Sequence, residues 1–276
     1  AFASKKDFNS SLNTLLNGLS RFDAPSNYLE KIFDLYLACN KHIEYSQFLL
    51  HSLKKYPQHA LLISRRLAAL GSVYPKIQRR PAIKKKNCDV LCIASDEEAY
   101  VAEFIHHYIF LGFSNIYVGV NNITDETLFV LKKIASHYNN VFILDVDLIQ
   151  REFKQAACYS YLYQYAKSRS DSQYYLIVDV DEFWVADKFP TSVNAFLGKN
   201  APFDVFSFQW VNQLNESFFT PPLSKCIYRP NPNVKSMISY DTLIRDFQIH
   251  APILINYDKF VVKQGRQVNA YLEIHD

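Results

Sequence analysis

Glycine occupies only 6 of the 276 positions, and the segment SDEEAY at 95–100, which follows an apolar strand-like run, contains none. A glycine-rich phosphate-binding loop is therefore missing from that place, which argues against a nucleotidyltransferase. No apolar run approaches the ~20 residues that cross a bilayer. The five cysteines are odd in number and form no CxxC pair, which favours reduced thiols in a cytoplasmic protein over a disulfide framework or a zinc site.

Charge of either sign is also modest. The net charge of +3 and the pI near 8.4 give no support for a polyanionic partner, so we expect no nucleic-acid binding. The one basic cluster, KIQRRPAIKKK at 76–86, is interpreted first as a solvated linker. Contact with phosphate groups or with an anionic membrane surface, and hence peripheral membrane association, stays open as the second interpretation.

Hydrophobic residues make up 49% of the chain and aromatic residues 15%, which is enough for one full core and a second, smaller one. Residues 10–75 repeat apolar side chains at helical spacing, with a break at Tyr56-Pro57. We therefore predict a small all-helical region with the basic linker at 1–86, which is suited to contact with an acceptor or a partner protein. A second domain is expected at 87–276.

Strand-like and helix-like segments alternate four times from DVLCIA at 89–94 to YYLIVDV at 174–180. Such alternation with short links predicts an α/β fold with a mostly parallel sheet sandwiched by helices. After residue 185 the pattern weakens. DVFSFQW at 204–210 is expected to form one more strand, and the proline-containing stretches TPPLSKC, RPNPN and NPNVKSM are expected to be loops over the sheet.

The stretch YYLIVDVDEFWV at 174–185 places Asp179, Asp181 and Glu182 at the end of an apolar strand. In an extended strand, residues i and i+2 share a face, so Asp179 and Asp181 are expected to project together. Open parallel sheets bind ligands at the carboxyl ends of their strands, and paired carboxylates suit Mg²⁺ or Mn²⁺. Acids that merely cap a strand in water, or an acid pair of a glycoside hydrolase, remain alternatives.

Together with SDEEAYVAEFIHHYIFLGFSNIYVGVNNITDET at 95–127 and the Q-x-x-C-Y pattern of Gln155, Cys158 and Tyr159, this stretch resembles the glycosyltransferase family 2-like and family 92-like proteins. The similarity covers about 88–186, roughly a third of the chain. It implies a GT-A fold that binds a nucleoside diphosphate sugar, with UDP as the expected nucleotide and Mn²⁺ or Mg²⁺ as the ion. Ser95, Asp96 and Val120 depart from the family pattern, which leaves the nucleotide contacts open.

The resemblance also implies roles for single residues. Asp179 would lie near the ribose or the donor sugar and share the metal, Asp181 would ligate the metal, and Glu182 would orient the site. The residues expected close to the nucleotide are Asp96, Glu97, Asn121 and Asp125.

The tail of the chain supplies the remaining candidates. Glu216 is the preferred base for an acceptor hydroxyl, with Asp241 and Asp246 as rivals. Positive groups that could reach the diphosphate are Lys225, Arg229 and Lys235, and histidines that could complete the metal shell are His250 and His275. Solvated loop charges are the plain alternative for all of these.

The leading interpretation is a metal-dependent glycosyltransferase that moves a sugar from a nucleoside diphosphate sugar to a glycan or lipid-linked acceptor, in the synthesis of a surface polysaccharide or lipopolysaccharide. A non-catalytic binding module with a glycosyltransferase-like sheet is the main alternative. A nucleotidyltransferase ranks below both because the glycine-rich loop is missing.

Overall fold

The structure is a computed structural model of the chain. It describes residues 5–19, 26–39, 41–73, 85–186, 189–214, 227–255 and 262–264. Within these ranges, none of the helices combines the length and the apolar character that a bilayer crossing requires.

The N-terminal part is helical, as predicted. Its elements are α1 (Lys5–Leu19), α2 (Ser26–Ala38), α3 (His42–Lys55), the short 3₁₀ helix η1 (Pro57–His59) and α4 (Ala60–Val73). Pro57 opens η1 at its first position, where the missing N–H costs no hydrogen bond, so the chain turns there. Apolar residues at helical spacing, such as Leu29, Ile32, Phe33 and Tyr36 of α2, form a separate core between these helices.

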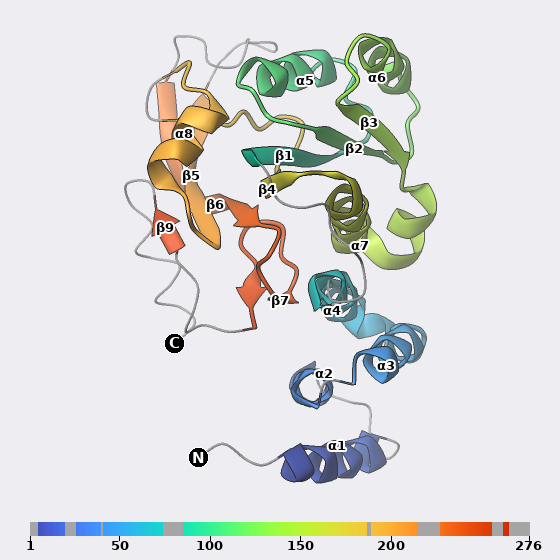
Figure 1. Cartoon of the computed structure of the whole chain (residues 1–276). Helices are drawn as coiled ribbons and strands as arrows, with labels where there is room; N and C mark the ends of the chain where they lie inside the picture. The colour runs from blue at the N-terminus through green and yellow to red at the C-terminus, as the bar shows by residue number, and fades with distance from the viewer. Residues whose placement is uncertain are drawn as a thin grey trace.

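A seven-stranded mixed sheet forms the centre of the remaining chain, in the order β3-β2-β1-β4-β6-β5-β9 (Figure 1). The strands are β1 (Lys85–Ala94), β2 (Ile116–Val120), β3 (Val141–Asp145), β4 (Ser172–Ile177), β5 (Val205–Leu214), β6 (Ile227–Ser239) and β9 (Val262–Gln264). Neighbouring strands from β3 to β4 are parallel, and β6 runs antiparallel to both β4 and β5. The prediction of a mostly parallel α/β sheet is confirmed.

Helices cover both faces of this sheet (Figure 1). On one face lie α5 (Val101–Phe110), α6 (Thr127–Ala135) and α8 (Val193–Asn200), and α7 (Asp147–Arg169) lies on the other. The alternation along β1 explains the two cores: Val90 and Cys92 pack toward α5, whereas Leu91 packs toward α7. Both faces of β1 are buried, which is why its sequence is a continuous apolar run.

The predicted loops RPNPN and NPNVKSM are strand residues, so this prediction was wrong. They belong to β6, which pairs with β5 from Ile227 to Ile238 except at Pro232 and Asn233. The register shifts between Gln209 and Trp210, close to Pro230 and Pro232, and such irregularities are the places where a sheet tolerates proline. The stretch TPPLSKC lies outside the described residues.

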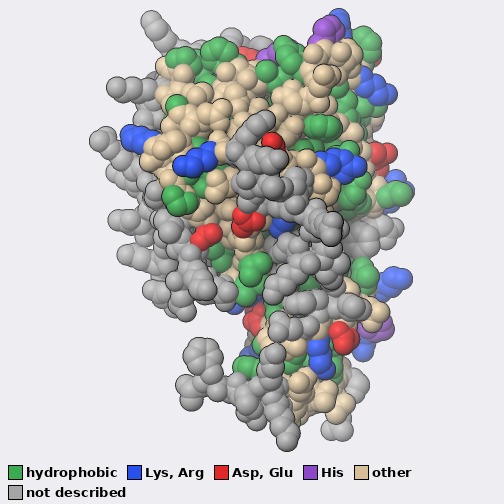
Figure 2. Space-filling model, viewed as in Figure 1, with side chains coloured by type: hydrophobic (Ala, Val, Ile, Leu, Met, Phe, Trp, Pro, Cys, Tyr) green, Lys and Arg blue, Asp and Glu red, His purple; other side chains and the backbone are tan. Residues whose placement is uncertain are grey.

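The helical part contacts the sheet part through α4, which packs against α7 and against the small hairpin of β7 (Ile244–Asp246) and β8 (Ile253–Leu254). Arg65 of α4 binds both carboxylate oxygens of Asp246, whose side chain is 3% exposed. The backbone N–H of Phe247 also donates to the Arg65 carbonyl over 3.3 Å. A domain boundary at residue 86 stays a prediction. On the described surface seen in Figure 2, basic and acidic side chains are interspersed.

Replacing Arg65 with methionine should lower the free energy of unfolding by about 3 kcal/mol, because Asp246 would remain buried without its cation. Urea denaturation measures the loss. Lys132→Met is the control: Lys132 of α6 is exposed, so its loss should cost less than about 1 kcal/mol. Equal losses in the two variants would contradict this account of the α4 contact.

Candidate active site

The expected site lies at one edge of the sheet. Because β1, β2 and β4 are parallel neighbours, their carboxyl ends at Ala94, Val120 and Ile177 share that edge. The loops that follow carry the acidic residues that the sequence singled out. The structure therefore brings the loops at 95–100, 121–126 and 178–184 together, as predicted from the alternation of strands and helices.

Two of the predicted nucleotide contacts join loops to each other. Asp96 has a positive φ of 53°, and its carboxylate accepts hydrogen bonds from the Thr124 N–H at 2.6 Å and the Thr124 hydroxyl at 2.8 Å. These hydrogen bonds lower the pKa of Asp96. Asp125 in turn accepts from the N–H groups of Glu98 and Thr127. Both carboxylates thus fix the loop after β1 against the loop after β2.

Glu97, in the loop after β1, has a raised pKa. Burial raises its pKa, and the nearby carboxylates of Asp181, Asp125, Asp179 and Asp96 raise it further. Such a shift shows that negative charge accumulates here, and an added cation would relieve it. Asn121 directly follows β2 and is half-buried, and its N–H donates to the Ala94 carbonyl over 3.0 Å.

The acidic motif does not continue the strand, contrary to the expectation for Asp179 and Asp181. β4 ends at Ile177, and the chain turns at residues 180–181. The Glu182 N–H donates to the Asp179 carbonyl over 3.0 Å, and the Asp179 N–H donates to Oε2 of Glu182 over 2.8 Å. Asp179 and Glu182 therefore face the same side, and Asp181 is exposed at the tip of the turn.

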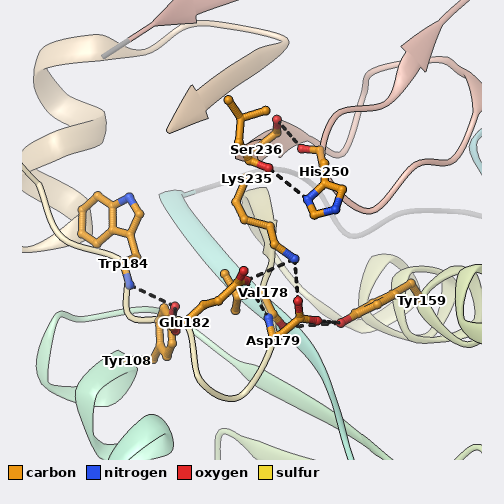
Figure 3. Close-up of polar contacts among 10 residues, drawn as sticks. Tyr108, Tyr159, Val178, Asp179, Glu182, Trp184, Lys235, Ser236 and His250 are labelled. Atoms are coloured by element: carbon orange, nitrogen blue, oxygen red, sulfur yellow. Dashed lines mark hydrogen bonds and ion pairs between the residues drawn. The ribbon is translucent and has the colours of Figure 1, made fainter. Parts of the chain in front are cut away.

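Lys235 of β6 supplies the positive charge that pairs with Asp179 and Glu182. Its Nζ lies 2.9 Å from Oδ2 of Asp179 and 3.1 Å from Oε2 of Glu182 (Figure 3). Only 5% of the Lys235 side chain is exposed. The sequence placed Lys235 in a loop and missed this role. The useful signal was the lone lysine in the run VKSMIS, because a buried lysine requires a carboxylate partner.

Two aromatic residues complete the surroundings of Lys235. The hydroxyl of Tyr159, from α7, donates to Oδ1 of Asp179 over 3.2 Å. Figure 3 shows Tyr159 reaching Asp179 from α7, on a different side from Lys235. The Lys235 Nζ also lies 5.5 Å from the centre of the Trp210 ring, a cation–π distance. Trp184, by contrast, is 6% exposed and part of the core.

Glu182 has an unusual protonation behaviour. Burial raises its pKa to about 7, although Lys235 and the Asp179 N–H act in the opposite direction. Its Oε1 is buried and has no hydrogen-bond partner among the described residues. A carboxyl group in this position exchanges a proton near neutral pH, whereas an ordinary glutamate does so near pH 4.5.

His250 is neutral and has a defined tautomer. Its Nδ1 lies 3.2 Å from the Val234 carbonyl, which only accepts, so the proton is on Nδ1. Burial lowers the pKa of His250, and the charge of Lys235 lowers it further. The Ser236 hydroxyl donates to the His250 carbonyl over 2.8 Å. In the described part of the chain Nε2 has no hydrogen-bond partner, so its lone pair can accept a proton.

Other candidates are not assembled with this group. Asp246 is bound to Arg65, which opposes its proposed role as a base. Asp241 lies just after the C-terminal end of β6. Arg229 is exposed near the N-terminal end of the same strand. Glu216, Lys225 and His275 lie outside the described residues, and their roles stay predictions.

The described side chains partly fit a divalent ion. They include no group of three His, Cys, Asp or Glu residues placed to hold one. Asp179 is already paired with Lys235, and unit charges 4 Å apart repel by about 4 kcal/mol at an effective dielectric constant of 20, so an ion at Asp179 would oppose this ammonium. Asp181 and Glu97 do fit, because Mg²⁺ and Mn²⁺ commonly use one or two carboxylates and take other ligands from substrate phosphates.

Comparisons with known proteins give distant structural likeness only. No protein-family model and no curated protein matches the chain. Glucosyl-3-phosphoglycerate synthase from Mycobacterium tuberculosis, with Mn²⁺, UDP and phosphoglyceric acid bound, is 15% identical over 47% of this chain and 48% of that chain, at a TM-score of 0.30. HddC from Yersinia pseudotuberculosis is 10% identical over 64% and 89%, at a TM-score of 0.36.

The chain thus spans about half the length of the synthase that it resembles. That synthase binds Mn²⁺ and UDP. At such identities and TM-scores, function has to be inferred from the residues of the site.

Glu182 should make stability depend on pH. Between the ordinary glutamate pKa of 4.5 and about 7, the native protein holds a proton that the unfolded chain has released, so the free energy of unfolding falls as pH rises. Glu182→Gln should remove this fall. Its stability relative to the wild type should increase by about 3 kcal/mol from about pH 4 to about pH 8.

Urea denaturation in the presence of a chelator measures the two profiles. Glu103→Gln, an exposed glutamate of α5, is the control and should leave the profile unchanged. A constant difference between Glu182→Gln and the wild type across this range would contradict the raised pKa.

Proposed function

We propose that this protein transfers a sugar from a nucleoside diphosphate sugar to an acceptor hydroxyl, with the donor bound where β1, β2 and β4 end. The observation that carries the proposal is the exposed Asp181 beside Glu97, whose pKa is raised by burial and by surrounding carboxylates. A site with excess negative charge, at the edge where open α/β sheets bind ligands, suits a cation that brings a diphosphate with it.

In this proposal, Asp181 and Glu97 are the residues that would hold Mn²⁺ or Mg²⁺. The bound ion would neutralise charge that develops on the departing diphosphate. Asp96 and Asp125 would not contact the ion; their role is to fix the two loops that line the donor. UDP is the expected nucleotide, and the acceptor is a glycan or a lipid-linked glycan of a surface polysaccharide.

We further propose His250 as the group that accepts the proton of the acceptor hydroxyl. The neutral imidazole donates through Nδ1 and leaves the Nε2 lone pair for this proton. The acceptor oxygen then bonds to the anomeric carbon, the bond from that carbon to the diphosphate oxygen breaks, and its electron pair leaves with the diphosphate. Glu216, the base favoured by the sequence, remains the rival candidate.

Nucleotide binding tests the proposed donor site. Calorimetry with UDP should detect binding in the presence of Mn²⁺, and Asp181→Asn should weaken it at least about tenfold, or about 1.4 kcal/mol. Asp171→Asn is the matched control, because Asp171 precedes the same strand at the opposite edge of the sheet. If UDP, GDP and CDP all fail to bind with Mn²⁺ present, the binding-module alternative is favoured.

A pH profile tests His250. With a donor that the protein binds, His250→Gln should slow transfer or hydrolysis by roughly 10²-fold or more while nucleotide affinity stays within about twofold. In the wild type the rate should rise with pH through a midpoint below the ordinary histidine value of about 6.5, because the lowered pKa keeps the imidazole neutral. An unchanged rate in His250→Gln would leave Glu216 as the candidate base.

A further inference from the structure

The turn at 179–182 is held by one buried ammonium group. Lys235 Nζ contacts Asp179 at 2.9 Å and Glu182 at 3.1 Å, and these two residues also close the turn through their own backbone and side-chain hydrogen bonds. Lys235 comes from β6, which pairs antiparallel with β4. A residue distant in sequence therefore fixes the conformation of the acidic motif (Figure 3).

Without this ammonium the turn would carry two facing carboxylates. One oxygen of each lies within hydrogen-bond distance of the same nitrogen atom, so removal of Lys235 takes away the group that bridges them. Loss of these two ion pairs would loosen the contact between Asp179 and Glu182. The hydrogen bond from the Asp179 N–H to Oε2 of Glu182, which closes the turn, depends on that contact.

Lys235 is poorly suited to bind a ligand directly. Its side chain is 5% exposed, and two carboxylates already accept from its Nζ. The Trp210 ring lies against it at 5.5 Å, and Tyr159 holds the other oxygen of Asp179. Asp181, in contrast, is exposed and has no hydrogen bond or ion pair with another described residue. The arrangement divides the motif into a fixed pair and one available carboxylate.

We propose that Lys235 is a positioning residue of the donor site: it binds Asp179 and Glu182, and so presents Asp181 as the carboxylate that meets the cation of the bound diphosphate. This inference rests on the proposed function and adds that Asp179 acts through Lys235, rather than as a metal ligand. Asp181 is then the only metal ligand that the turn supplies, and Asp179 and Glu182 hold the turn in place through Lys235.

A double-mutant cycle on the affinity for UDP with Mn²⁺ tests this. Lys235→Met and Asp179→Asn should each weaken binding by about tenfold, the size typical for residues that support a metal ligand. The double variant should bind UDP no more weakly than the single variant with the lower affinity, because both substitutions break the same interaction. Asp181→Asn should weaken binding more than either, and its effect should multiply with that of an unrelated exposed change such as Lys132→Met.

Three results would overturn the assignment. Tighter binding in Lys235→Met would show that the lysine competes with the cation for Asp179. A double variant whose loss equals the product of the two single losses would show that Lys235 acts on the ligand by itself. Unchanged affinity in a folded Lys235→Met protein would reduce the residue to a structural role.

Amide hydrogen exchange gives a readout that needs no nucleotide. Lys235→Met should speed exchange at the N–H groups of Asp179 and Glu182, which close the turn, and leave the amides of β2 unchanged. Lys235→Gln serves as a second variant if the methionine protein does not fold. If the wild type binds no nucleotide, the proposed function fails, while faster exchange would still support the positioning role and unchanged exchange would overturn it.

Discussion

The contact of the Lys235 ammonium with Asp179 and Glu182 is the interaction on which the candidate site depends. The side chains of Lys235 and Glu182 are only 5% and 13% exposed, so either charge would be costly to bury alone, and Asp179, 38% exposed, completes the group. Buried ion pairs contribute little net stability, but they tolerate few alternative geometries. This one joins β4 to β6 and determines how the chain leaves the sheet after Ile177.

The pairing also separates the charges of the site into two groups. Asp179 and Glu182 are paired with Lys235, whereas Glu97 and Asp181 lie near each other's charge without a cation among the described residues. An acidic motif that looks uniform in the sequence thus has a supporting half and an available half. In the proposed function, the available half would hold the cation and its phosphate-bearing ligand.

The N-terminal helices are connected to this region through a short chain of contacts. Arg65 binds Asp246, and its carbonyl accepts from Phe247, three residues before His250. His250 is held in turn by Val234 and Ser236, the neighbours of Lys235. The helical part therefore lies against the segment that brings His250 to the site, and its position bears on the geometry of β6.

The sequence alone determined the helical N-terminal part, the mostly parallel sheet and the edge at which the acids gather, because periodicity and strand ends are local properties. It misjudged β6, since two prolines in RPNPN are typical of loops and only pairing with β5 along the strand makes them strand residues. It also predicted that Asp179 and Asp181 share a face. The tertiary structure decided otherwise, because a buried ammonium 54 residues beyond Asp181 favours the turn that places Asp179 beside Glu182. Such long-range electrostatic pairing has no periodic signature in the sequence, and only the fold brings its partners within reach.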